Sequence, residues 1–181
     1  PEIASARRAV LGLTLRVREG HFAPMPDISF SSFNPRSFEQ FAQALAGRVL
    51  GPGLLVFGDG PDGGREASFK GRVPYPSTAE RWDGLIVLQA KFHLRPTSDG
   101  KDVSWLVAQI GAEAAKLAPG HVPDYYLVVT NIRLSGVRGR ERKGGQQKVD
   151  DAFERHLKPL GVKALHVWHE EKIATLLDAE P

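Results

Sequence analysis

The first residues that could carry chemistry lie inside an apolar run, where polar side chains are unexpected. Residues 85–94 (LIVLQAKFHL) predict a strand that is apolar on both faces and therefore central in a sheet. Gln89 and Lys91 interrupt this strand two positions apart, so they point to the same face. Because an unpaired buried lysine loses its charge or destabilises the fold, we expect an acidic group or a bound anion beside Lys91.

The Gly-rich segment before this strand supplies candidate acids. Residues 58–64 (GDGPDGG) predict a tight turn that carries Asp62 and leads to Glu66, with Asp59 nearby. Carboxylate and amide oxygens hold Mg²⁺, the metal activates water, and a lysine positions the nucleophile or stabilises the transition state. Phosphodiester hydrolysis needs this assortment. The alternative is structural, with turn aspartates and Lys91 in an ion pair with one of the acids.

Hydrophobic periodicity predicts the elements that position these residues. Asn34 is suited to cap a helix, and Pro35 to begin it. In chain order we expect a helix to residue 49, strands at 54–57, from about 66 and at 85–94, a helix at 103–118, a strand at 125–132, a helix at 147–157, a strand at 164–168 and a helix at 170–178. Residues 73–76 are interpreted as a Pro-rich connector. This order predicts an α/β fold with a mixed central sheet of four to five strands, flanked by helices on both faces.

Composition limits the number of domains and the cellular compartment that we expect. A chain of 181 residues, 41 % of them hydrophobic, is expected to form one domain over residues 25–181. Residues 1–24 are either an upstream extension before Met25 or an N-terminal element packed on the domain. The absence of cysteine excludes disulfides and thiolate zinc sites. Because no apolar run is long enough to span a membrane, we expect a soluble protein without a membrane partner. The lack of cysteine fits a reducing compartment, so we expect a cytoplasmic location.

A basic, Gly-rich stretch lies between residues 133 and 148. The net charge of +3 is too small to name a partner, but this stretch concentrates basic residues around the single acid Glu141. It is either a solvated surface loop or a phosphate-binding segment. The candidates for nucleic-acid contact are Arg138, Arg140, Arg142 and Lys143.

Three motifs resemble those of the PD-(D/E)xK nucleases, especially the Mrr-type branch and the nuclease domains fused to bacterial STAND or NACHT NTPases in antiviral defence. They are SFEQF (37–41), PDGGRE (61–66) and VLQAKF (87–92), and the resemblance covers about residues 27–178. It implies a restriction-endonuclease-like fold and a DNA endonuclease that depends on Mg²⁺, with Mn²⁺ as a possible substitute. It also implies a fused NTPase or sensor region as a partner, and a homo-oligomer on activation.

The resemblance assigns roles residue by residue. Asp62 resembles the acid of the PD element, Glu66 replaces an aspartate that follows a Gly-Gly turn, and Gln89 to Lys91 resemble the (D/E)xK element. Asp62, Glu66 and Gln89 are then the metal ligands, and Glu39 resembles a further acid on the first helix. Gln89 departs from the pattern, because an amide offers only a neutral oxygen. We therefore expect metal binding to depend more on Glu66 and Glu39.

Other functions stay open on the sequence. The nuclease fold can persist as a catalytically inactive module that binds nucleic acid or protein, and Gln89 favours this alternative. A different α/β domain with chance motif similarity would place Asp62, Glu66 and Lys91 far apart. Gln109, on the helix after Lys91, faces either the site or solvent. His166 and His169 are expected to be structural or surface residues, because no acid or cysteine completes a zinc set around them.

Overall fold

A five-stranded mixed sheet forms the centre of the fold, with the strand order β3–β4–β5–β6–β7. The structure is a computed structural model that describes residues 15–16, 27–53, 55–56, 67–97, 100–117, 121–137, 139 and 143–179. The strands are β3 (Leu55–Val56), β4 (Ala67–Pro76), β5 (Arg81–Lys91), β6 (Tyr125–Thr130) and β7 (Ala164–Trp168). Strands β3, β4 and β5 pair antiparallel, whereas β5, β6 and β7 pair parallel. The predicted mixed sheet of four to five strands is confirmed.

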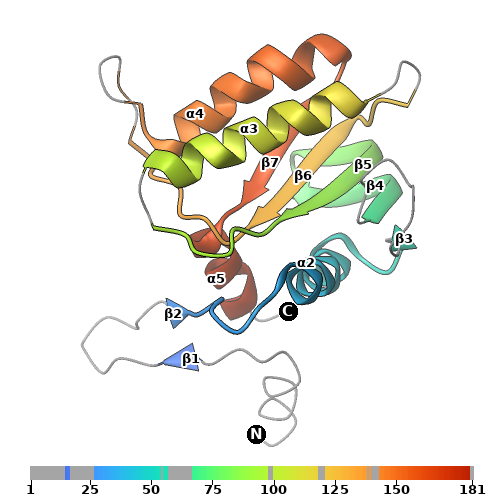
Figure 1. Cartoon of the computed structure of the whole chain (residues 1–181). Helices are drawn as coiled ribbons and strands as arrows, with labels where there is room; N and C mark the ends of the chain where they lie inside the picture. The colour runs from blue at the N-terminus through green and yellow to red at the C-terminus, as the bar shows by residue number, and fades with distance from the viewer. Residues whose placement is uncertain are drawn as a thin grey trace, which may run out of the picture.

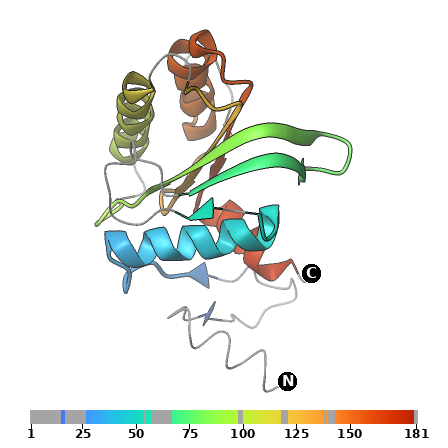
Figure 2. The ribbon, with the colours of Figure 1, turned by 90° about the vertical axis from the view of Figure 1, so that its right-hand side faces the viewer.

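Helices cover both faces of this sheet (Figures 1 and 2). Helices α2 (Pro35–Leu50) and α5 (Glu170–Asp178) lie on one face, and α3 (Gly100–Lys116) and α4 (Gly145–Ala152) lie on the other. A π-helical turn (Phe153–Leu157) and a 3-10 turn (Lys158–Leu160) follow α4. The two faces build separate hydrophobic cores, as an α/β fold requires. No helix among the described residues is long and apolar enough to cross a membrane.

Strand β5 lies in the interior of the sheet, between β4 and β6, as its apolar pattern predicts. Its residues alternate between the two cores, with Ile86, Leu88 and Ala90 in the core that contains α2 and Val87 in the core that contains α3. Gln89 and Lys91 have the same parity as Val87, so they belong to the α3 face. The pairing of β5 with β6 ends at Lys91 opposite Thr130.

The predicted connector at residues 73–76 is wrong, because these residues belong to β4, which forms a long hairpin with β5. Beyond its first two residues β4 has no described neighbour on its outer side, and an edge strand tolerates proline. Val73 and Tyr75 are buried, and the hydroxyl of Tyr75 accepts a hydrogen bond from Trp168 Nε1 at 2.8 Å. Strand β5 correspondingly begins and ends earlier than residues 85–94.

Helix α2 begins at the predicted cap. The Asn34 side chain accepts a hydrogen bond from the Ser37 amide at 2.9 Å, and Ser37 Oγ accepts one from the Asn34 amide at 2.9 Å. Phe38, Phe41 and other apolar residues of α2 pack against the sheet. This packing places the first turns of α2 near the end of β5, where Glu39 becomes relevant.

A separate two-stranded sheet pairs β1 (Leu15–Arg16) with β2 (Asp27–Ile28). Residues 1–14 and 17–26 lie outside the described residues. The division of the chain at residue 25 therefore stays a prediction.

Candidate active site

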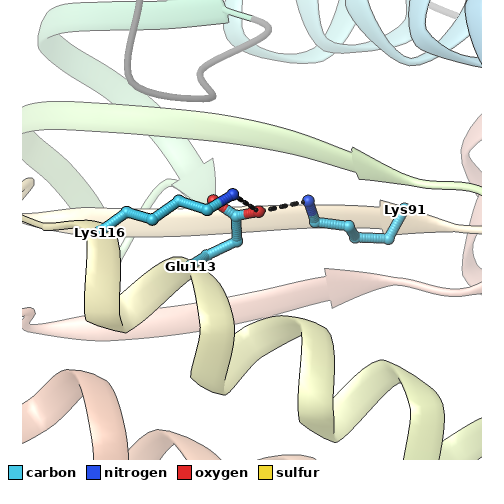
Figure 3. Close-up of polar contacts among 3 residues, drawn as sticks. All are labelled: Lys91, Glu113 and Lys116. Carbon is cyan, nitrogen blue, oxygen red and sulfur yellow. Dashed lines mark hydrogen bonds and ion pairs between the residues drawn. The ribbon is translucent and has the colours of Figure 1, made fainter.

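Lys91, the last residue of β5, forms an ion pair with Glu113 of α3. Lys91 Nζ lies 2.8 Å from Glu113 Oε1, and Lys116 Nζ lies 3.0 Å from the same oxygen (Figure 3). The side chains of Lys91 and Glu113 are 14 % and 6 % exposed, whereas that of Lys116 is 56 % exposed. The acidic group that burial of Lys91 demands is therefore Glu113.

The carboxylate of Glu113 is ionised although its side chain is buried. Burial by itself would raise the pKa of Glu113, but the hydrogen bonds and charges of Lys91 and Lys116 outweigh it and lower that pKa. At neutral pH the carboxylate is thus ionised and accepts two charge-assisted hydrogen bonds. Removing the Glu113 carboxylate would leave the buried Lys91 ammonium without this partner, whereas removing Lys91 would leave Glu113 paired only with the exposed Lys116.

Sequence reasoning missed Glu113, although α3 carries a signal for it. Leu106, Ile110 and Ala114 form the buried stripe of this helix, and Glu113 follows Ile110 at a spacing that places it on the same stripe. A carboxylate on the inner face of a helix requires a buried cation or a set of donors. Lys91 has the complementary requirement, since a buried cation needs an acidic group beside it.

Gln89 is buried beside this pair, at only 1 % exposure. Its Oε1 accepts no hydrogen bond from the residues that the structure describes. An unpaired amide oxygen in a buried position costs free energy, and a cation or a donor would offset that cost. The donor chemistry therefore fits the predicted role of Gln89 as a metal ligand. No group of three potential ligands (His, Asp or Glu) comes together within the described ranges.

A pocket of about 180 Å³ lies at the carboxyl end of β5. Lys91 lines this pocket together with Glu39 from α2 and Gln109 from α3. The remaining lining residues are Pro35, Ala90, Phe92 and Trp105. Of the two alternatives left open for Gln109, the structure shows the one that faces the site. Glu39 and Lys91 line this pocket together, although α2 lies on one face of the sheet and the Lys91 side chain belongs to the other.

The candidate ligands Asp62 and Glu66, and Asp59 nearby, lie outside the described residues. Their convergence with Gln89 and Lys91 stays a prediction. The segment that carries them joins β4 at Ala67, which pairs with Leu88, the neighbour of Gln89.

Hydrogen bonds hold the chain beyond Lys91 against Asn131, which follows the last residue of β6. The buried side chain of Asn131 accepts a hydrogen bond from the His93 amide and donates one to the His93 carbonyl, both at 2.8 Å. The His93 ring packs edge-on against Trp105, a pocket residue, with 4.8 Å between centroids. Asn131 therefore fixes the backbone that follows the site.

His166 and His169 are both partly buried. His166 Nδ1 lies 3.0 Å from the hydroxyl of Tyr75, within an aromatic cluster with Trp82. Burial lowers the pKa of His166 and that of His169, so neither is a cation at neutral pH.

The predicted nucleic-acid contacts are only partly described. Lys143 lines a second pocket, of about 890 Å³, beside the first residues of α3 and α4. Arg133 and Lys148 also line it, together with the acid Glu171. Lys143 Nζ pairs with Asp151 at 2.5 Å. The other three candidates, Arg138, Arg140 and Arg142, lie outside the described residues.

Comparison of the chain with protein-family models, with curated proteins and with solved structures found no match.

Proposed function

We propose that this chain is a metal-dependent nuclease domain that hydrolyses phosphodiester bonds in DNA. The observation that supports it most is the pocket at the end of β5, where Glu39, Lys91 and Gln109 meet from three separate elements. The first two are residues to which the resemblance to PD-(D/E)xK nucleases gives a role. A crevice at the carboxyl ends of parallel strands is also the usual place for ligands in such sheets.

Each kind of side chain at the site has a different part in the proposed hydrolysis. Lys91 supplies a positive charge that stabilises the negative charge developing on the phosphate. The Gln89 amide oxygen and the carboxylates of Asp62, Glu66 and Glu39 are the oxygen ligands that Mg²⁺ or Mn²⁺ would use. The bound metal supplies charge neutralisation and an activated water. Gln109 can hold a polar group of the substrate by hydrogen bonds.

The second pocket supports DNA as the substrate. Arg133, Lys143 and Lys148 surround it near the start of two helices, and helix amino ends favour phosphate groups. The resemblance extends the proposal further, to an effector module of a bacterial antiviral defence protein. In that proposal a fused NTPase or sensor region controls the domain, which forms a homo-oligomer when activated.

A second candidate function is a catalytically inactive module that binds nucleic acid or protein. It is favoured by the neutral side chain at position 89 and by the ion pair that already satisfies Lys91. In this case Lys91 would have only a structural role. Cleavage activity separates the two candidates.

The deciding experiment is plasmid cleavage with and without Mg²⁺. We expect the wild-type domain to cleave only with the metal, and Lys91→Ala to lower the rate about 100-fold or more, since one charged group at the transition state contributes about 3 kcal/mol. Lys70→Ala is the matched control, because Lys70 is an exposed lysine on β4. If wild type and Lys91→Ala are equally inactive under all metal conditions, the inactive module is the better description.

A further inference from the structure

Glu113 is the only described carboxylate that bonds to Lys91, and it does so from a position where a carboxylate is costly. Its side chain is 6 % exposed on the apolar stripe of α3. Buried ion pairs seldom add net stability relative to apolar residues of the same size. The contact therefore needs an explanation other than stability, and Lys91 offers one, because it lines the candidate pocket.

A lysine has four flexible bonds, so its ammonium group samples many positions unless something holds it. Figure 3 shows the Lys91 side chain reaching from the end of β5 to the carboxylate of Glu113. In nearly dry surroundings this contact is stronger than the same contact in water. The Lys91 ammonium is thereby restricted to one region, next to the pocket that its own side chain helps to line.

The second bond of Glu113 has a different character. Lys116 lies three residues further along α3 and is 56 % exposed, and such surface pairs contribute little. Lys116 is also not among the residues that line the pocket at the end of β5. Lys116 therefore bonds to the same Glu113 oxygen but does not line the pocket. A substitution of Lys116 serves as a control for the loss of a Glu113 contact.

We infer that Glu113 is a positioning residue, which holds the Lys91 ammonium in place for the proposed phosphodiester hydrolysis without touching the substrate itself. This inference rests on the proposed function. A positioning residue and a metal ligand differ in what their loss changes: the first lowers kcat, and the second raises the Mg²⁺ concentration needed for activity.

The first test measures cleavage kinetics over a range of Mg²⁺ concentrations. We expect Glu113→Gln, which keeps the shape but removes the charge, to lower kcat by about tenfold, with KM for DNA and half-saturating Mg²⁺ unchanged. Glu113→Asp should recover part of the rate, because the charge returns on a shorter side chain. Lys116→Ala should stay within about twofold of wild type. A shifted Mg²⁺ requirement in Glu113→Gln would overturn the inference in favour of a ligand role.

The second test works whether or not the protein cleaves DNA. Amine labelling of the folded protein at a fixed pH, read by mass spectrometry, reports how freely each lysine reacts. We expect labelling of Lys91 to rise about tenfold in Glu113→Gln, with Lys70 unchanged as the reference. Unchanged labelling of Lys91 would overturn the anchoring. Increased labelling with an unchanged kcat would overturn the positioning role, whereas an inactive wild type with increased labelling would overturn the proposed function and leave the anchoring supported.

Discussion

Gln89 presents an amide oxygen, buried beside Lys91, that no described residue satisfies. Either the fold tolerates the free-energy cost of this unpaired oxygen, or the oxygen binds a ligand in the working protein. A substitution to glutamate distinguishes the two cases, because the shapes match and only the charge and one donor group change.

We expect Gln89→Glu to lower the half-saturating Mg²⁺ concentration several-fold, since a carboxylate binds the ion more tightly than an amide. Without metal the variant should be less stable than wild type, because it buries a carboxylate at a position that is only 1 % exposed and where no described residue donates a hydrogen bond to the side-chain oxygen. Thermal denaturation with and without Mg²⁺ measures both effects. If Mg²⁺ stabilises the variant and the wild type equally, Gln89 only packs. Gln89→Met, which removes the oxygen, is the matched control and should lose the metal response.

The lowered pKa of Glu113 predicts a pH dependence of stability. A carboxyl group whose pKa is lower in the folded state stabilises the fold at pH values above its ordinary value of 4.5, and this contribution disappears as the pH falls through the folded-state pKa. Wild type should therefore exceed Glu113→Gln in free energy of unfolding by about 2 kcal/mol at pH 7. The difference should shrink below pH 4.5. Urea denaturation at several pH values tests this, and a constant difference down to pH 3 contradicts it.

At the scale of elements, the site depends on how the end of β5 is held. Strand β5 is paired on both sides, and its last residue is followed by a turn that Asn131 fastens through two hydrogen bonds to His93. Asn131 is 2 % exposed, so water cannot replace these bonds when its side chain is removed. The pocket residue Lys91 comes two positions before His93, and the His93 ring packs against the pocket residue Trp105.

We expect Asn131→Ala to destabilise the fold by about 2 kcal/mol, because two buried backbone groups lose their partners. Hydrogen exchange should accelerate at the His93 amide more than at the amides of β5. Asn34→Ala is the control, since removing this helix cap costs about 1 kcal/mol at the start of α2 without affecting that amide. Unaltered protection at His93 in Asn131→Ala would mean that the turn holds its shape without Asn131.

At the scale of the molecule, the central sheet separates two hydrophobic cores and leaves its carboxyl end open. The smaller pocket receives residues from both faces, since Glu39 belongs to α2 and Gln109 to α3. The larger pocket adjoins the basic stretch through Lys143.

Neutralising Arg138, Arg140, Arg142 and Lys143 together should weaken DNA binding and flatten its salt dependence. Each lost phosphate contact removes about 0.9 from the slope of log K against log salt. The cleavage rate at saturating DNA should change little, because none of these residues supplies the chemistry. A control with Lys70, Arg72 and Arg81 replaced by glutamine removes exposed charge from the β4–β5 hairpin. Equal binding and equal slopes for both variants would identify the basic stretch as a solvated loop.

Local patterns in the sequence predict most elements of this fold. They also predict that Lys91 needs a negatively charged partner. The cap at Asn34, the apolar stripes and the strand around Gln89 and Lys91 depend on neighbours within a few residues, so period and propensity find them. The same reasoning failed for residues 73–76, where proline predicts a break unless it is known that the strand lies at an edge.

The burial of Lys91 determines from the sequence that a negative partner must exist, but not which residue it is. Glu113 lies 22 residues further along the chain, on a helix whose position follows from packing against β5 and β6. Likewise, only the tertiary structure brings Glu39 and Gln109 to one pocket. Side-chain types and spacing determine what each residue needs. The packing of elements that are distant in sequence decides which groups meet, because the pattern of one segment does not identify its partner in another.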